Sequence, residues 1–122
     1  MDPLYREIIL EHWQNPQNAG VIPNADFDIT ETNPLCGDEI RLTGKIKDSK
    51  LIEIAFEGKG CAISQASASL LTEEIKGERL VSIKRKNEKD ILELLGIALT
   101  PARIKCALLV LNTLQKGIIL LS

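Results

Sequence analysis

The chain is poor in aromatic residues, and its positive and negative charges nearly balance. Only 3% of its 122 residues are aromatic, while 44% are hydrophobic, so a core must be built mainly from Leu, Ile, Val and Ala. The formal net charge is -2, which gives no electrostatic basis for binding nucleic acid or an anionic membrane surface. We therefore expect neither a nucleic acid nor a membrane as a partner.

Long apolar runs are absent as well. No stretch approaches the ~20 apolar residues that span a bilayer, and the start Met1-Asp2-Pro3 lacks the basic region of a signal peptide. The three cysteines are an odd number, so they cannot all pair within one chain. These features favour a reducing, cytoplasmic location with free or metal-bound thiols, and the length favours a single domain over residues 1–122.

Histidine is almost missing, and this limits the possible chemistry. His12 is the single histidine, on the first predicted helix and far in sequence from every cysteine, so we expect it to face solvent or a partner. A Cys-His hydrolase would depend on it, which argues against thiol hydrolysis. The glycines around Lys59 lack the spacing and the Lys-Ser/Thr pair of a phosphate-binding loop. The basic run at residues 84–86 is expected to be a solvated face.

Hydrophobic patterning predicts helices and a small sheet. Alternation predicts a weak edge strand near residues 27–29 and an antiparallel hairpin from residues 40–46 and 52–56. Helical spacing predicts a first helix that starts at Pro3 and stops at Asn15. The remaining predicted helices cover residues 62–77, 89–95 and 101–117, the last capped by Thr100 and ended by Gly117, while residues 80–87 are ambiguous.

The end of the chain, residues 118–121, is apolar. We expect this tail to pack back onto the core. An exposed tail would instead form a contact between copies of the chain, so the expected state is a monomer or a weak homo-oligomer.

Four potential metal ligands occur in three separate contexts. Cys36 and Asp38 flank a glycine in a loop, Cys61 follows a glycine at the start of a predicted helix, and Cys106 lies near the start of the last helix. Three thiols and a carboxylate suit tetrahedral zinc, or iron in a sulfur cluster. A helix N-terminus favours the thiolate form of Cys61, and Lys105 places a cation beside Cys106.

Spacing alone leaves two interpretations open. There is no Cys-x-x-Cys motif, so neither a zinc ribbon nor a thioredoxin motif applies. Scattered, buried structural thiols are one interpretation. A metal site is the other, and the glycine-rich surroundings of Cys36 and Cys61 favour it, because buried structural cysteines seldom need such loops.

Four segments, in order, carry a resemblance that covers nearly the whole chain. They are HWQNP at residues 12–16, NPLCGD at 33–38, FEGKGCAIS at 56–64 followed by ASAS at 66–69, and PARIKC at 101–106. The chain resembles the IscU/SufU (NifU N-terminal-like) family of iron–sulfur cluster assembly proteins.

The resemblance implies an α+β fold, with a small antiparallel sheet of about three strands and helices packed on one face. It also implies that Cys36, Asp38, Cys61 and Cys106 meet at one exposed edge. In this family such a site holds zinc or an assembling [2Fe-2S] cluster, with iron as the intermediate. The implied partners are a pyridoxal-phosphate-dependent cysteine desulfurase, which supplies sulfur, and apo iron–sulfur proteins, which accept the product.

Features of two branches are mixed in this chain. The segments around Cys61 and Cys106 are SufU-like, and Lys105 stands where the IscU branch carries a histidine. The SufU insertion before the last helix is absent, however, so the length is IscU-like. The Leu-Pro-Pro-Val-Lys motif by which IscU binds its chaperone is also missing, and residues 99–103 read Leu-Thr-Pro-Ala-Arg instead.

Three functions remain open at this point. The first is a scaffold, not itself an enzyme, on which a cluster forms at Cys36, Cys61 and Cys106 with Asp38 as the labile ligand, because a carboxylate binds soft metals less well than a thiolate. The second is a zinc-dependent sulfurtransferase in which Cys36, as in SufU, or Cys106, as in IscU, accepts persulfide sulfur. In both, Lys105 supports the charge of the site. The third is a structural zinc-binding interaction domain.

Overall fold

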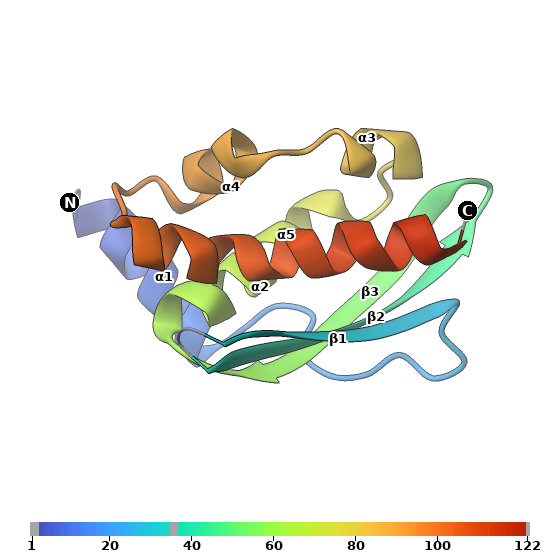
Figure 1. The fold of residues 1–122 in the computed structure, drawn as a ribbon, viewed down its shortest axis with the longest axis horizontal. Helices are drawn as coiled ribbons and strands as arrows, with labels where there is room; N and C mark the ends of the chain where they lie inside the picture. Colours follow the sequence, from blue (N-terminus) through green and yellow to red (C-terminus); the bar gives the residue numbers. More distant parts are fainter. Residues whose placement is uncertain (1–2, 35–36, 122) are drawn as a thin grey trace.

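An antiparallel sheet of three strands, in the order β1-β2-β3, forms one layer of the structure. The computed structural model describes residues 3–34 and 37–121. Figure 1 shows the helices gathered on one side of the sheet, with α5 running across it. The α+β fold predicted from the sequence is therefore confirmed. The elements are α1 (Pro3–Gln14), β1 (Phe27–Asn33), β2 (Asp38–Lys47), β3 (Lys50–Lys59), α2 (Ala62–Ile75), α3 (Leu80–Lys84), α4 (Glu88–Leu95) and α5 (Pro101–Leu121).

The predicted hairpin is confirmed as β2 and β3. Its two-residue loop, Asp48 and Ser49, has φ values of 54° and 61°, the left-handed pair of a type I′ turn. β1 is longer than the predicted edge strand, because it pairs with β2 from Phe27 opposite Gly44 to Asn33 opposite Asp38. This full-length pairing places the start of β2 at a defined point beside the end of β1.

The last helix does not end at Gly117, so that prediction is wrong. α5 continues to Leu121, and a Cβ at Gly117 would lie 3.0 Å from Cγ2 of Ile29 and 3.3 Å from Cδ2 of Phe27. The missing side chain thus lets α5 lie close against β1. Glycine often ends a helix because of its backbone freedom. Here Gly117 is needed instead for close packing against β1, and the helix continues past it.

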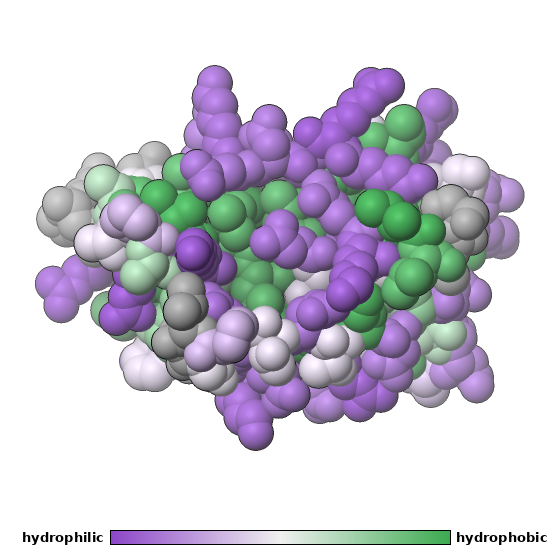
Figure 2. Space-filling view, viewed as in Figure 1, coloured by the Kyte–Doolittle hydropathy of each residue, from purple (hydrophilic) through white to green (hydrophobic). Residues whose placement is uncertain are grey.

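The apolar tail is divided between core and surface. Ile118 is 1% exposed and packs into the core, as expected, whereas Ile119 and Leu120 are 61% and 72% exposed. The expectation that the whole tail packs inward is therefore wrong for these two residues. Figure 2 shows a hydrophobic patch at this end of the molecule.

The segment before α5 is built from short capped helices. The ambiguous residues 80–87 form α3 and then the cap of α4, where Asn87 and Asp90 make a reciprocal capping box. The predicted α4 is confirmed, and it ends at Gly96 in the left-handed conformation with φ 68°. The Thr100 hydroxyl accepts a hydrogen bond from the Arg103 amide at 3.4 Å, in agreement with its predicted capping role.

The face of the sheet away from the helices carries charged pairs. Arg41 lies between Asp28, at 2.7 Å, and Glu57, at 3.1 Å. The hydrogen bond from Arg41 holds the pKa of Asp28 below its usual range. Within residues 3–34 and 37–121, none of the helices has the length and apolar character that crossing a membrane requires.

Candidate metal site

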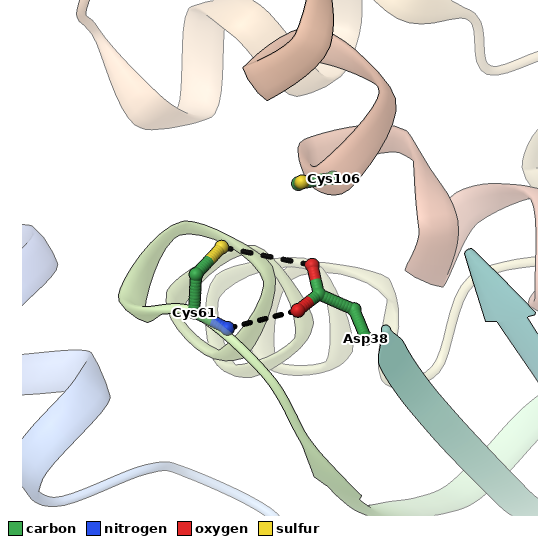
Figure 3. Close-up of side chains that lie close together, drawn as sticks. All are labelled: Asp38, Cys61 and Cys106. Carbon is green, nitrogen blue, oxygen red and sulfur yellow. Dashed lines mark hydrogen bonds between the residues drawn. The ribbon is translucent and has the colours of Figure 1, made fainter. Parts of the chain in front are cut away.

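Side chains from three separate elements converge at one end of the sheet. Asp38 is the first residue of β2, Cys61 immediately precedes α2, and Cys106 lies in the second turn of α5. One oxygen of Asp38 and the two sulfur atoms all lie within 4.8 Å of one another (Figure 3). The structure therefore brings together three of the four predicted ligands. Cys36 lies outside the described residues, so its place at the site stays a prediction.

The connection between β1 and β2 fixes Asp38. Asn33 pairs directly with Asp38 across the two strands, and the Gly37 amide donates to the Asn33 carbonyl at 2.8 Å. Gly37 has φ 73°, a backbone conformation that a glycine adopts without steric cost. As a result the Asp38 side chain points inward and is only 1% exposed.

Cys61 faces Asp38 through both its backbone and its side chain. Its amide donates to Oδ1 of Asp38 at 3.0 Å, and its thiol donates to Oδ2 at 3.6 Å (Figure 3). Cys61 is the N-cap residue of α2, as predicted, with φ -73° and ψ 165°. A bound metal ion would replace the thiol proton between the sulfur and Oδ2, because thiol ligands bind as thiolates.

Of the two described thiols, Cys106 is the more deeply buried. It is 3% exposed, whereas Cys61 is partly exposed. The Asn33 side-chain amide donates to the Cys106 sulfur at 4.0 Å, a long contact within the range of hydrogen bonds to sulfur. The position of Asn33 beside Cys106 follows from its pairing with Asp38 across β1 and β2, which no local sequence pattern shows.

Lys105 and His12, which the sequence also singled out, lie outside this group of ligands. Lys105 is exposed beside Cys106, and its charge-supporting role stays a prediction. His12, expected to face solvent or a partner, is half-buried: its Nδ1 lies 2.6 Å from the Ser69 hydroxyl, and that hydroxyl accepts a hydrogen bond from the Gln17 amide at 2.8 Å. His12 therefore ties α1 to α2 and, among the described residues, is not part of the ligand group.

The donor set fits a zinc or iron ion. Thiolates are the ligands that both metals favour in proteins, and a carboxylate completes many such sites. The site also lies at the N-terminal ends of α2 and α5, whose dipoles stabilise negative charge there. The two sulfurs and the carboxylate can therefore converge on one cation.

Comparisons with known proteins match this chain over nearly its whole length. The family model of the NifU-like N-terminal domain matches residues 4–120. The chain is 39% identical to the zinc-dependent sulfurtransferase SufU of Bacillus subtilis, over 97% of this chain and 91% of SufU. It is 35% identical to the iron–sulfur cluster assembly scaffold protein IscU of Escherichia coli, over 93% of this chain and 91% of IscU.

Solved structures show the same fold. A SUF-system scaffold from Fervidobacterium islandicum superposes with a TM-score of 0.82 and 29% identity, over 92% of this chain and 94% of that one. A NifU-like N-terminal protein from Brucella abortus, 24% identical over 98% of this chain and 95% of that one, superposes with a TM-score of 0.80 and supports the fold alone.

Alignment lengths agree with the predicted mixture of features. The alignment with SufU extends over 135 positions, more than the 122 residues of this chain, so SufU contains residues without a counterpart here. The alignment with IscU extends over 118 positions. The chain belongs to the NifU-like N-terminal domain family, together with the SufU and IscU proteins that it matches.

Proposed function

We propose that the protein is an iron–sulfur cluster assembly protein that builds its cargo at Asp38, Cys61 and Cys106, with Cys36 as the fourth ligand. The convergence of three ligand atoms within 4.8 Å is the observation that carries this proposal. Relatives that cover nearly the whole chain and are named cluster assembly scaffolds support it. Iron enters first in this scheme, and a [2Fe-2S] cluster is the product that leaves.

The chain's own residues divide the work at this site. The thiolates hold the soft metal, and Asp38, the weaker ligand for such metals, is the position that opens for release. Lys105, exposed beside Cys106, offsets part of the negative charge. The partners are a pyridoxal-phosphate-dependent cysteine desulfurase and apo iron–sulfur acceptors. The chain acts as one cytoplasmic domain over residues 1–122, as a monomer or weak homo-oligomer.

A zinc-dependent sulfurtransferase is the second candidate, and the 39% identity to SufU supports it equally well. In this case the same residues bind zinc. A thiolate of the chain attacks the outer sulfur of the desulfurase persulfide, a new S–S bond forms on the acceptor, and the desulfurase thiolate leaves. Cys36 and Cys106 are the candidate acceptors. Cys106 is 3% exposed, so it can react with a partner only after local opening.

A structural zinc-binding domain is the third candidate. It requires that the fold depend on the metal, so removal of zinc with a chelator would unfold the chain and no sulfur would be accepted. A chain that stays folded without zinc and accepts sulfur would exclude this third function.

One anaerobic experiment separates the candidates. The protein is incubated with a cysteine desulfurase, cysteine and ferrous iron while absorbance records cluster formation and mass spectrometry locates added sulfur atoms on each cysteine. We expect a cluster that transfers to an apo ferredoxin. Stable zinc with one sulfur added to a single thiol, and no cluster, would instead establish sulfur transfer as the function.

Replacement of Asp38 by alanine tests the release step. We expect the assembled cluster to survive several-fold longer in Asp38→Ala than in the original protein, because the weakest ligand is removed and the thiolates remain. Decay of the cluster absorbance after addition of a chelator measures this lifetime. Glu39→Ala is the matched control, since it removes a neighbouring carboxylate of β2 that pairs with Lys59 at 3.8 Å. Faster decay in Asp38→Ala than in the control would contradict the proposed role.

A further inference from the structure

We infer that Asp38 divides two tasks between its two carboxylate oxygens. Oδ1 fixes Cys61 and the start of α2, and Oδ2 is the oxygen that it offers to bound metal. We further infer that Gly60 is the positioning residue that gives Oδ1 room for the first task. The second task rests on the proposed function, whereas the first rests only on contacts within the chain.

The two oxygens already have different partners. Oδ1 accepts a hydrogen bond from the Cys61 backbone amide at 3.0 Å, whereas Oδ2 faces the Cys61 sulfur at 3.6 Å (Figure 3). The amide contact leaves the sulfur available, so it can persist when the thiol proton is exchanged for a metal ion. One carboxylate can therefore hold the backbone of a ligand residue and bind the same metal as its side chain.

Cys61 needs this support because of its place in the helix. The N-cap position usually carries Ser, Thr, Asp or Asn, whose side-chain oxygen accepts from the first helical amides. The Cys61 side chain makes no capping hydrogen bond. A carboxylate from the neighbouring strand supplies negative charge to this helix end instead. The thiol is thereby released from capping and points to the ligand group.

Gly60 makes the arrangement possible. Its φ of 151° lies in a region that residues with a side chain rarely adopt. A Cβ at this position would also collide with Oδ1 and approach Cβ of Asp38 to 2.9 Å. The glycine before Cys61 is therefore required by the Asp38 carboxylate as well as by the backbone. Gly77 provides a matched comparison, because it has φ 83° but open space where its Cβ would be.

The first experiment measures backbone amide exchange at Cys61 by NMR, in protein stripped of metal. Asp38→Asn keeps an oxygen that can accept from the Cys61 amide, and Asp38→Ala does not. We expect exchange to accelerate by about tenfold or more in Asp38→Ala, the size expected for loss of a hydrogen bond to a charged group. The rescue expected in Asp38→Asn is a rate within about threefold of the original protein. Equal rates in Asp38→Ala and the original protein would overturn the inference.

The second experiment uses cobalt(II) as the probe, because its thiolate charge-transfer absorbance increases with the number of bound thiolates. Gly60→Ala retains every ligand residue, but its added Cβ collides with Asp38 and pushes the neighbouring Cys61 backbone away from the ligand group. We expect a weaker thiolate band per cobalt in Gly60→Ala than in Gly77→Ala, which also places a side chain at a positive φ but without the collision. Identical spectra from the two variants would show that Gly60 has no positioning role.

The two experiments fail independently of the proposed function. Both Asp38 variants remove the charged ligand, so a difference between them in Cys61 exchange reports the contact with the Cys61 amide and not the charge of the ligand. A protein that builds no cluster, yet shows the exchange difference, would retain the first task of Asp38 and lose the proposed function. A protein that builds a cluster, with equal exchange in all forms, would retain the function and lose this inference.

Discussion

Serine in place of Cys106 is expected to lower the affinity of the protein for zinc by more than about a hundredfold, beyond the loss typical for residues that only support a ligand. The serine hydroxyl stays protonated at neutral pH and is a poor ligand for a metal that favours thiolates. Since serine nearly preserves the size of this buried side chain, 3% exposed, the fold is retained. Competition with a chromophoric chelator, starting from metal-free protein, measures the dissociation constant.

The same result is expected for Cys61→Ser, because the two sulfurs and Asp38 belong to one group. Thr113→Ser is a suitable control, since Thr113 is fully buried on α5 and its hydroxyl donates to the Leu109 carbonyl at 2.7 Å. The control should bind zinc as the original protein does. Zinc affinity within about threefold of the original in Cys106→Ser, with an unchanged circular dichroism spectrum, would remove Cys106 from the ligand set.

Much of this site follows from the sequence because its local signals are strong. A glycine before Cys61 and a helical pattern after it place that thiol at the start of α2, and Thr100 with Pro101 does the same for the helix of Cys106. Spacing could not show that these helix ends meet. That conclusion came from the resemblance to a family, and the ligand distances within 4.8 Å agree with it for the described residues.

Contacts between distant segments account for what the sequence did not predict. Nothing local indicates that Asp38 binds the amide of Cys61, because β2 and α2 meet only in the folded chain. A glycine at position 117 suggests the end of a helix, yet Gly117 lies within α5 and allows the helix to pack closely against β1. His12 reads as a surface residue until α2 supplies the Ser69 hydroxyl. In each case the deciding contact is with a segment that is distant in the sequence, so a pattern among neighbouring residues cannot predict it.

Replacement of Phe56 by alanine is expected to lower the free energy of unfolding by about 3–5 kcal/mol. Phe56 is 2% exposed on β3, opposite Leu42 of β2, so its truncation leaves a cavity in the core. Urea unfolding of the metal-free protein, followed by circular dichroism, measures the loss. Ile52→Ala on the same strand is the control, because Ile52 is 43% exposed and its truncation should cost about 0.5 kcal/mol.

Zinc should largely restore the stability of Phe56→Ala, because a ligand that binds only the folded chain stabilises it. At a thousandfold excess over the dissociation constant this stabilisation is about 4.1 kcal/mol, similar to the loss from the cavity. The restoration depends on the site, so the double variant Phe56→Ala/Cys106→Ser should gain little from the same zinc concentration. Equal stabilisation of the single and double variants would place the bound zinc elsewhere on the chain. A gain confined to the single variant would show that zinc bound at the site of Cys106 stabilises the folded chain as a whole.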